Sequence, residues 1–150
     1  MKNLESFIPI SIGVWIGISL LVSRVSGWAS LAKYYRSSES FQGERVHLQS
    51  GALRWKTSYN NCLTVGMNYY GLYLSVFLIL RFGHPNIFIP WADVSAVKKR
   101  GLLTPCVEFR FRQTPTIPFR VSERLGRRIV EGAGASWTHE NPFDEDPLKK

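Results

Sequence analysis

The order of hydrophobic and polar positions divides the chain into an apolar N-terminal segment and a longer, mostly polar remainder. From Ser6 to Ser23 no charged residue occurs, and apolar side chains follow one another without regular alternation. A helix over this stretch is about 27 Å long, close to the thickness of the hydrocarbon core of a bilayer. The sequence therefore predicts one transmembrane helix at 6–23, anchored by the side chains of Ile8, Ile10, Ile12, Val14, Trp15, Ile16, Ile18, Leu20, Leu21 and Val22.

From Arg45 onward the hydrophobic period is two, which is typical of strands that bury one face. Leu63, Val65, Met67 and Tyr69 share one face, for example, and the residues between them are small or polar. Glycine, proline and asparagine interrupt the pattern at short intervals, as expected where antiparallel strands turn. The pattern predicts about seven short antiparallel strands.

Two segments of this region need a separate interpretation. The run Gly71–Leu80 is strongly apolar but too short to cross a bilayer as a helix, and its β-branched and aromatic residues predict two central strands or one long bent strand. After a last strand at 116–121, Ser122 stands where a helix N-cap is expected. The predicted helix 123–131 runs into Gly132 and Gly134, where a stop by glycine is expected. A C-terminal helix that closes the open end of a bent sheet buries the apolar faces of both.

These elements predict a transmembrane helix at 6–23, a juxtamembrane linker at 24–44, a β-domain at 45–133 and a flexible C-terminal tail at 134–150. Within the linker, Trp28, Tyr34 and Tyr35 follow the apolar segment closely. Because amphipathic aromatic side chains settle at the headgroup level of a bilayer, we expect the stretch Gly27–Arg36 of this linker to continue along the membrane surface.

Basic residues flank the apolar segment unequally. Lys2 precedes it, whereas Arg24, Lys33 and Arg36 follow it, and positive charge is enriched on the cytoplasmic side of membrane helices. We therefore expect a single-pass protein of the cell inner membrane with its C-terminal domain in the cytoplasm. The alternative is a cleaved signal peptide and an exported domain, because Gly27-Trp28-Ala29 has the small-x-small form of a signal-peptidase site.

Gly13 and Gly17 have the small-xxx-small spacing that lets two helix backbones approach closely in lipid. Because glycine is frequent in membrane helices, an incidental occurrence is the main interpretation. A homodimer, or pairing with another membrane helix, is the alternative that the spacing allows.

Two short motifs of the β-domain resemble those of a known family. Gly71-Leu72-Tyr73-Leu74 is followed by Ile89-Pro90-Trp91-Ala92-Asp93-Val94 and then by Val97. Over Arg45 to Gly132 the chain resembles the bacterial PH-like domains, membrane-linked relatives of the pleckstrin-homology superfold. The resemblance implies a mainly β fold, a seven-stranded and partly open barrel capped by a C-terminal helix. It does not imply that the domain binds phosphoinositides.

The chain has 19 Lys and Arg against 11 Asp and Glu, a net charge of +8, which favours an anionic neighbour. We expect Lys98, Lys99 and Arg100 to form a basic turn between strands, and lipid headgroups are the nearest anions for a tethered domain. A solvated face that serves solubility is the alternative. Nucleic acid is not expected, because no nucleic-acid-binding motif occurs. The candidate contacts with an anionic surface are Lys98, Lys99, Arg100, Arg110, Arg112 and Arg120.

Residue types that carry catalysis or bind metals are scattered along the chain. His47, His84 and His139 have no partner at the spacing of metal ligands, and no nucleophile, zinc or nucleotide motif occurs. Cys62 and Cys106 are predicted to act as small buried hydrophobic residues, with a disulfide between them as the alternative in an oxidising compartment. We therefore expect no enzyme activity, no cofactor and no metal. The sequence favours a binding or scaffolding module for an unidentified protein or the anionic lipid surface.

Overall fold

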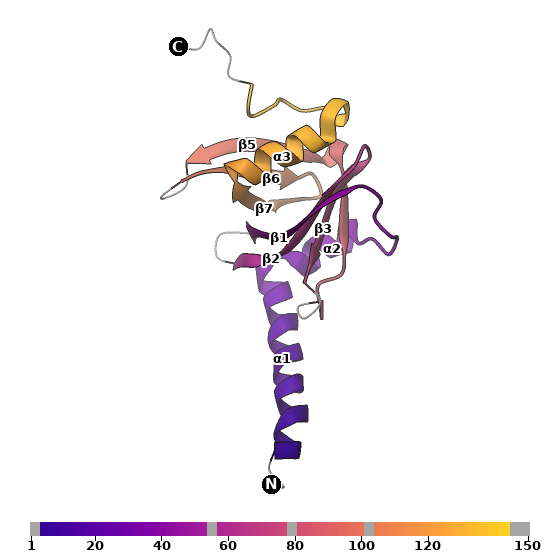
Figure 1. The fold of residues 1–150 in the computed structure, drawn as a ribbon, viewed down its shortest axis with the longest axis vertical. Coiled ribbons are helices and arrows are strands. Elements are labelled where there is room, and N and C mark those ends of the chain that lie inside the picture. Colours follow the sequence, from indigo (N-terminus) through magenta and orange to yellow (C-terminus); the bar gives the residue numbers. More distant parts are fainter. Residues whose placement is uncertain (1–3, 54–56, 78–80, 101–103, 145–150) are drawn as a thin grey trace.

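The structure is a computed structural model that describes residues 4–53, 57–77, 81–100 and 104–144 (Figure 1). The helices are α1 (Leu4–Ser26), α2 (Trp28–Tyr35) and α3 (Glu123–Ala133), and the short 3₁₀ turns are η2 (Trp91–Asp93) and η3 (Gly134–Ser136). The strands are β1 (Glu44–Leu53), β2 (Thr57–Met67), β3 (Gly71–Val76), β4 (Ile87–Pro90), β5 (Val94–Arg100), β6 (Pro105–Phe111) and β7 (Thr114–Ser122).

The described strands form one seven-stranded antiparallel sheet in the order β4-β3-β2-β1-β7-β6-β5. β4 and β5 follow each other in the chain across η2 but form the two edges of the sheet, so the sheet does not close. The mainly β fold with a C-terminal helix and an apolar N-terminal helix, predicted from the sequence, is confirmed.

β3 is a single buried strand that pairs with β2 on one side and β4 on the other. The central strand predicted within 71–80 is therefore confirmed for 71–76. Residues 78–80, at the end of that apolar run, lie outside the described residues.

The ends of α3 agree only partly with the sequence prediction. The side-chain oxygen of Ser122 accepts a hydrogen bond from the backbone N of Leu125 at 3.3 Å, which confirms the predicted N-cap. α3 extends two residues beyond the predicted end at 131, to Ala133, and the predicted stop by glycine is confirmed at Gly134, whose φ is +53°. Gly132 serves close packing instead, since a Cβ on it would lie 2.8 Å from the Cβ of Met67.

α2 packs into the core of the domain. Trp28, Leu31, Ala32 and Tyr35 share one face of the helix and are buried with the apolar side chains of the sheet. The structure thus differs from the expected linker along the membrane surface, because Trp28 and Tyr35 face the protein interior and only their neighbour Tyr34 is exposed. The core extends from α2 across the inner faces of the strands to α3.

A left-handed residue at Gly27 separates α1 from α2. Its φ of 90° is a conformation that glycine adopts without the steric cost of a side chain. α1 extends away from the sheet (Figure 1), and its segment Phe7–Ser26 is long and apolar enough to cross a membrane. Most of the predicted anchoring side chains are exposed along it. A Cβ at Gly13 or Gly17 would meet open space among the described residues, so pairing through this face stays a prediction.

The first part of the predicted flexible tail packs on the domain. The ring of Trp137 lies 5.9 Å from that of Trp91 and 6.4 Å from that of Phe109, measured between centroids. The guanidinium carbon of Arg127 lies 4.5 Å from the ring centroid of Phe143. The tail is therefore anchored on the domain up to this point, and residues 145–150 lie outside the described residues.

Candidate functional site

The predicted basic turn is part of a strand. Lys98, Lys99 and Arg100 are the last three residues of β5, because the ladder with β6 continues to the pair Arg100–Pro105. The prediction that these residues form the turn was wrong, and residues 101–103 between the two strands lie outside the described residues. Basic side chains suit this position, because lysine on an edge strand discourages pairing with the edges of other sheets.

A buried carboxylate gathers part of the predicted basic surface. Glu108, on β6, is 1% exposed, and its Oε2 lies 3.0 Å from Lys99 Nζ and 3.2 Å from Arg120 Nε. Its Oε1 lies 2.8 Å from Arg110 Nε. The register explains the cluster, because Glu108 is paired directly with Arg120 on β7. The sequence analysis did not single out Glu108, although a lone acidic residue two positions before Arg110 on the same strand was the available signal.

The basic neighbours of Glu108 also set its ionisation. Burial alone would raise the pKa of Glu108, but the hydrogen bonds and charges of Lys99 and Arg110 outweigh that effect and lower the pKa below its ordinary value of 4.5. Glu108 is therefore ionised at neutral pH. Three cations minus one carboxylate leave a charge of +2 on this cluster, so part of its charge is compensated within the protein.

The structure does not bring the remaining basic candidates into the Glu108 cluster. Lys98 Nζ lies 3.6 Å from Oε1 of Glu123, at the start of α3. Arg100 and Arg112 are exposed, the first at the end of β5 and the second just after β6. β5 itself lies at the end of the domain far from α1 (Figure 1). The predicted basic residues therefore do not form one continuous surface next to α1.

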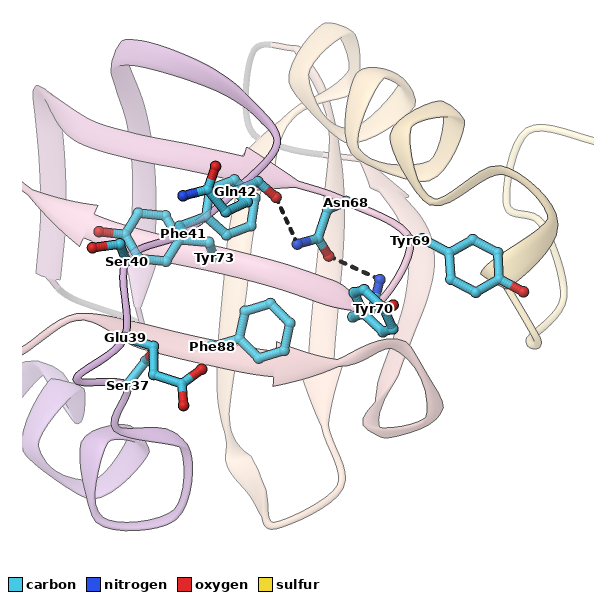
Figure 2. A pocket seen from close by; sticks show the side chains of 10 residues that line it. All are labelled: Ser37, Glu39, Ser40, Phe41, Gln42, Asn68, Tyr69, Tyr70, Tyr73 and Phe88. Carbon is cyan, nitrogen blue, oxygen red and sulfur yellow. Dashed lines mark hydrogen bonds between the residues drawn. The ribbon is translucent and has the colours of Figure 1, made fainter.

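A pocket lined by aromatic side chains lies beside β3 and β4 (Figure 2). It encloses about 440 Å³, within the usual range of ligand sites. The segment that joins α2 to β1 forms one wall, and the β2–β3 turn forms another. Its lining residues are Ser37, Glu39, Ser40, Phe41, Gln42, Asn68, Tyr69, Tyr70, Tyr73 and Phe88.

Phe41 fixes the first wall of this aromatic pocket on the sheet. Its ring stacks on that of Tyr73, with centroids 4.7 Å apart and an angle of 15° between the planes. The guanidinium carbon of Arg45 lies 5.5 Å from the Phe41 centroid and 5.7 Å from the Tyr73 centroid. Gly66 leaves space for Phe41, because a Cβ there would lie 2.6 Å from its Cε1 atom.

Asn68 fixes the second wall, the β2–β3 turn. Its Nδ2 donates to the carbonyl of Gln42 at 2.9 Å, and its Oδ1 accepts from the backbone N of Tyr70 at 2.8 Å (Figure 2). The indole Nε1 of Trp91 donates to the carbonyl of Asn68 at 2.7 Å. The turn is therefore held from both sides, and it presents Tyr69 and Tyr70, which are 72% and 74% exposed.

The aromatic pocket was not predicted from the sequence. The period-two pattern placed Tyr69 on the buried face that ends at Met67, and this was wrong because the turn begins at Asn68. The signal that would have found the site is the run Asn68-Tyr69-Tyr70-Gly71. Turn positions favour small polar residues, so two large aromatic residues there indicate a role other than turning the chain.

The residues considered for catalysis, metals and a disulfide lie apart. His84 is buried, whereas His47 and His139 are exposed on other elements. Cys62 and Cys106 are free, partly buried thiols, and burial raises the pKa of Cys62. Within the described parts of the chain, no three His, Cys, Asp or Glu side chains are grouped to hold a metal ion.

Comparison with known proteins gives no relative for this chain. No protein-family model matches the sequence, and no curated protein and no solved structure matches it either. The resemblance to PH-like domains therefore rests on the sequence motifs alone.

Proposed function

We propose that this chain is a non-enzymatic binding module, held at the cell inner membrane by α1 as a single-pass anchor, whose PH-like domain binds a protein partner in the cytoplasm. The observation that carries the proposal is the aromatic pocket flanked by the exposed Tyr69 and Tyr70. Tyrosine is enriched at protein interfaces because it offers a large, rigid contact area at a low cost in conformational entropy. The resemblance to membrane-linked PH-like domains supports the same function.

Core packing at the start of α2 supports an uncut anchor over a cleaved signal peptide. Cleavage after Ala29 would remove Trp28, which is 0% exposed and donates its Nε1 hydrogen to the carbonyl of Pro85 at 2.9 Å. An exported domain released at this site would begin with a cavity in its core, and such cavities cost several kcal/mol. The small-x-small sequence is therefore better explained by the bend between two helices.

The position of the basic residues supports a protein partner over the lipid surface. β5, which carries Lys98, Lys99 and Arg100, lies at the end of the domain far from α1 (Figure 1). Polybasic segments gain affinity for anionic lipids only when they reach the headgroups, within about a Debye length of the surface. Glu108 in addition compensates part of the charge of its neighbours.

The chemistry of the aromatic pocket suits an extended segment of the partner. Phe88 and Tyr70 offer flat apolar faces, while the hydroxyls of Ser37 and Ser40 and the carboxylate of Glu39 lie at its edge (Figure 2). Aromatic grooves with hydrogen-bonding edges bind extended, proline-containing segments, whose backbone needs little further ordering. We expect the partner to insert one or two proline or other apolar side chains.

Site-specific photo-crosslinking of the full chain in its native membrane tests this function. A photo-reactive phenylalanine analogue in place of Tyr70 is expected to give one discrete protein adduct. The same analogue in place of Tyr34, an exposed tyrosine of α2 outside this pocket, is the matched control and should not give that adduct. Phe88→Ala in the chain labelled at position 70 should abolish the adduct, because it removes a wall of the pocket.

Two results would contradict the proposal. Lipid adducts alone at position 70, or a protein adduct that persists in Phe88→Ala, would exclude this pocket as the protein-binding site. A mature N-terminus just after Ala29 would exclude the anchor. The cytoplasmic orientation is checked separately by a reporter that is active only in the periplasm, which should stay silent when fused after Lys150.

A further inference from the structure

The C-terminal part of α1 is held directly against the connection between β3 and β4. Ser19 Oγ donates to the carbonyl of Phe82 at 2.7 Å, and Ser23 Oγ donates to the carbonyl of Gly83. Gly83 has a φ of +75°, and a Cβ on it would lie 2.7 Å from Cδ2 of Leu20. The backbone of the connection therefore lies directly against side chains of the helix.

A second set of buried contacts joins the end of α1 to the sheet. Ser26 Oγ lies 2.8 Å from the hydroxyl of Tyr59, which lies 3.0 Å from Nε2 of His84. The ring of Trp28 lies 5.7 Å from that of Tyr59 and 5.4 Å from that of His84. Burial raises the pKa of Tyr59 to about 12, so its hydroxyl stays protonated in this cluster. The helix end and the β3–β4 connection thus form one packed unit.

The contact at Ser19 lies within the apolar segment of α1. Arg24 is the first charged residue after that segment, and arginine at the end of a membrane helix lies at the level of the headgroups. At 1.5 Å per residue, the carbonyl of Phe82 meets α1 about 7.5 Å closer to the bilayer centre than Arg24. The described part of the β3–β4 connection contacts α1 at Phe82 and Gly83, through Ser19 and Ser23. In Figure 1 α1 meets the domain at this end. If α1 spans the bilayer, Phe82 lies at the level of the acyl chains.

The side chains that the connection exposes fit this depth. Phe82 is 52% exposed and Phe77, at the other end of the connection, is 53% exposed. The carbonyl of Phe82 is bonded to Ser19, next to the exposed Leu20 and Leu21 of α1. Arg81 is exposed beside Phe82, and an arginine side chain is long enough to extend from an apolar layer to the headgroups. The apolar surface of the helix thus continues onto the domain.

We propose that the β3–β4 connection is a second membrane contact, in which Phe82 inserts among the lipid acyl chains beside α1. This inference rests on the proposed anchoring by α1. Together with the packed helix end, the contact holds the domain on the bilayer in one orientation, with β5 on the far side.

Depth-resolved fluorescence quenching in the full chain tests the inference. Cys62 and Cys106 are replaced by alanine, and Phe82→Cys, Ile12→Cys and Tyr70→Cys are each labelled with an environment-sensitive NBD fluorophore. The chain is reconstituted in vesicles of phosphatidylethanolamine and phosphatidylglycerol that contain lipids with a nitroxide on the acyl chain. We expect blue-shifted, quenched emission at positions 82 and 12, and unshifted, unquenched emission at position 70.

The pattern of quenching separates this inference from the anchoring on which it rests. Quenching at position 12 but not at position 82 would overturn the inference and leave the anchor in place, whereas no quenching at either would overturn both. The backbone carbonyl of Phe82, not its ring, binds Ser19, so Phe82→Cys keeps that contact. As a second measurement, a membrane-impermeant maleimide should modify Phe82→Cys several-fold more slowly than Tyr70→Cys in vesicles, and equal rates would contradict insertion.

Discussion

The burial of α2 predicts that a soluble fragment of this domain folds only when it contains that helix. A fragment 27–144 keeps α2, whereas a fragment 41–144 begins at Phe41 and lacks it. The deletion removes Trp28 and Leu31, both fully buried, and Tyr35, which is 6% exposed. The sequence analysis placed these three residues in a linker. Comparing the two fragments therefore tests whether the segment is a linker or part of the hydrophobic core.

The size of the effect can be worked from the burial of these side chains. Burying a large apolar side chain contributes about 1.5–3 kcal/mol to the free energy of unfolding, so Trp28, Leu31 and Tyr35 contribute roughly 5–9 kcal/mol together. The hydrogen bonds from Trp28 to Pro85, at 2.9 Å, and from Tyr35 to Asp93, at 3.0 Å, add about 1 kcal/mol each. Domains are stable by about 5–15 kcal/mol in total, so the deletion removes most of the stability.

Urea denaturation followed by circular dichroism and tryptophan fluorescence measures the difference. Fragment 27–144 is expected to unfold in one cooperative transition and fragment 41–144 to show none. Within fragment 27–144, Leu31→Ala should lower the free energy of unfolding by about 2–5 kcal/mol. Lys33→Ala, at an exposed position of the same helix, should change it by less than about 0.5 kcal/mol. A cooperative transition of fragment 41–144 at the same urea concentration as fragment 27–144 would refute the packing of α2.

Other substitutions test single contacts, and an unchanged free energy of unfolding would contradict each one except the control Gly13→Ala. Glu108→Gln should lower that free energy by about 1–2 kcal/mol at neutral pH, because it leaves three partly exposed cations beside a buried neutral amide. Because the pKa of Glu108 is lower in the folded state than in the unfolded state, its ionised carboxylate stabilises the folded protein fully above pH 4.5. This stabilisation is lost as the pH falls through the lowered pKa. In urea titrations, acid should therefore destabilise the parent protein more than the Glu108→Gln variant. Gly27→Ala should cost about 1–2 kcal/mol in thermal unfolding because of its φ of 90°, whereas Gly13→Ala, in open space on α1, should cost nothing. Tyr59→Phe removes the hydroxyl between two buried polar groups, so it should cost about 1–3 kcal/mol and speed amide exchange at the end of α1.

The strands could be predicted because a period of two in the hydrophobic residues indicates which face of a strand is buried. This pattern can be seen within each strand alone. In β6, Val107, Phe109 and Phe111 are buried as the alternation predicts. Glu108 lies between them on the other face and is also buried, because Lys99 on β5 and Arg120 on β7 satisfy its carboxylate. Those partners are brought together by strand register, so the pattern along one strand could not show them.

α2 was misplaced for a different physical reason. Trp28, Leu31, Ala32 and Tyr35 follow the spacing of one helical face, and that signal was present in the sequence. An amphipathic helix next to a membrane anchor has the same composition whether lipid or protein covers its apolar face. The helical period shows that the apolar face of α2 is buried, but it does not show whether lipid or protein buries it.

The aromatic pocket depends on distances that the sequence does not contain. Phe41 reaches Tyr73 only because the segment after α2 crosses the sheet over Gly66, and Phe88 joins them because β4 pairs with β3. Each of these residues, taken alone, fits a buried aromatic position. Only the turn residues Asn68 to Gly71 carried a local sign of the site.

The distribution of charge connects the pocket with the proposed orientation on the bilayer. Four exposed basic residues lie near the end of α1, on and just after α2, and on the β3–β4 connection: Arg24, Lys33, Arg36 and Arg81. Among the described residues, none of the four forms an ion pair. The basic cluster on β5 to β7, by contrast, is partly compensated by Glu108. On the proposed anchoring by α1, attraction to anionic headgroups would act mainly on the end of the domain next to α1, with about 1 kcal/mol for each cation that reaches the surface. The proposed insertion of Phe82 would act on the same end, and this orientation would leave the flank with the aromatic pocket open to a partner.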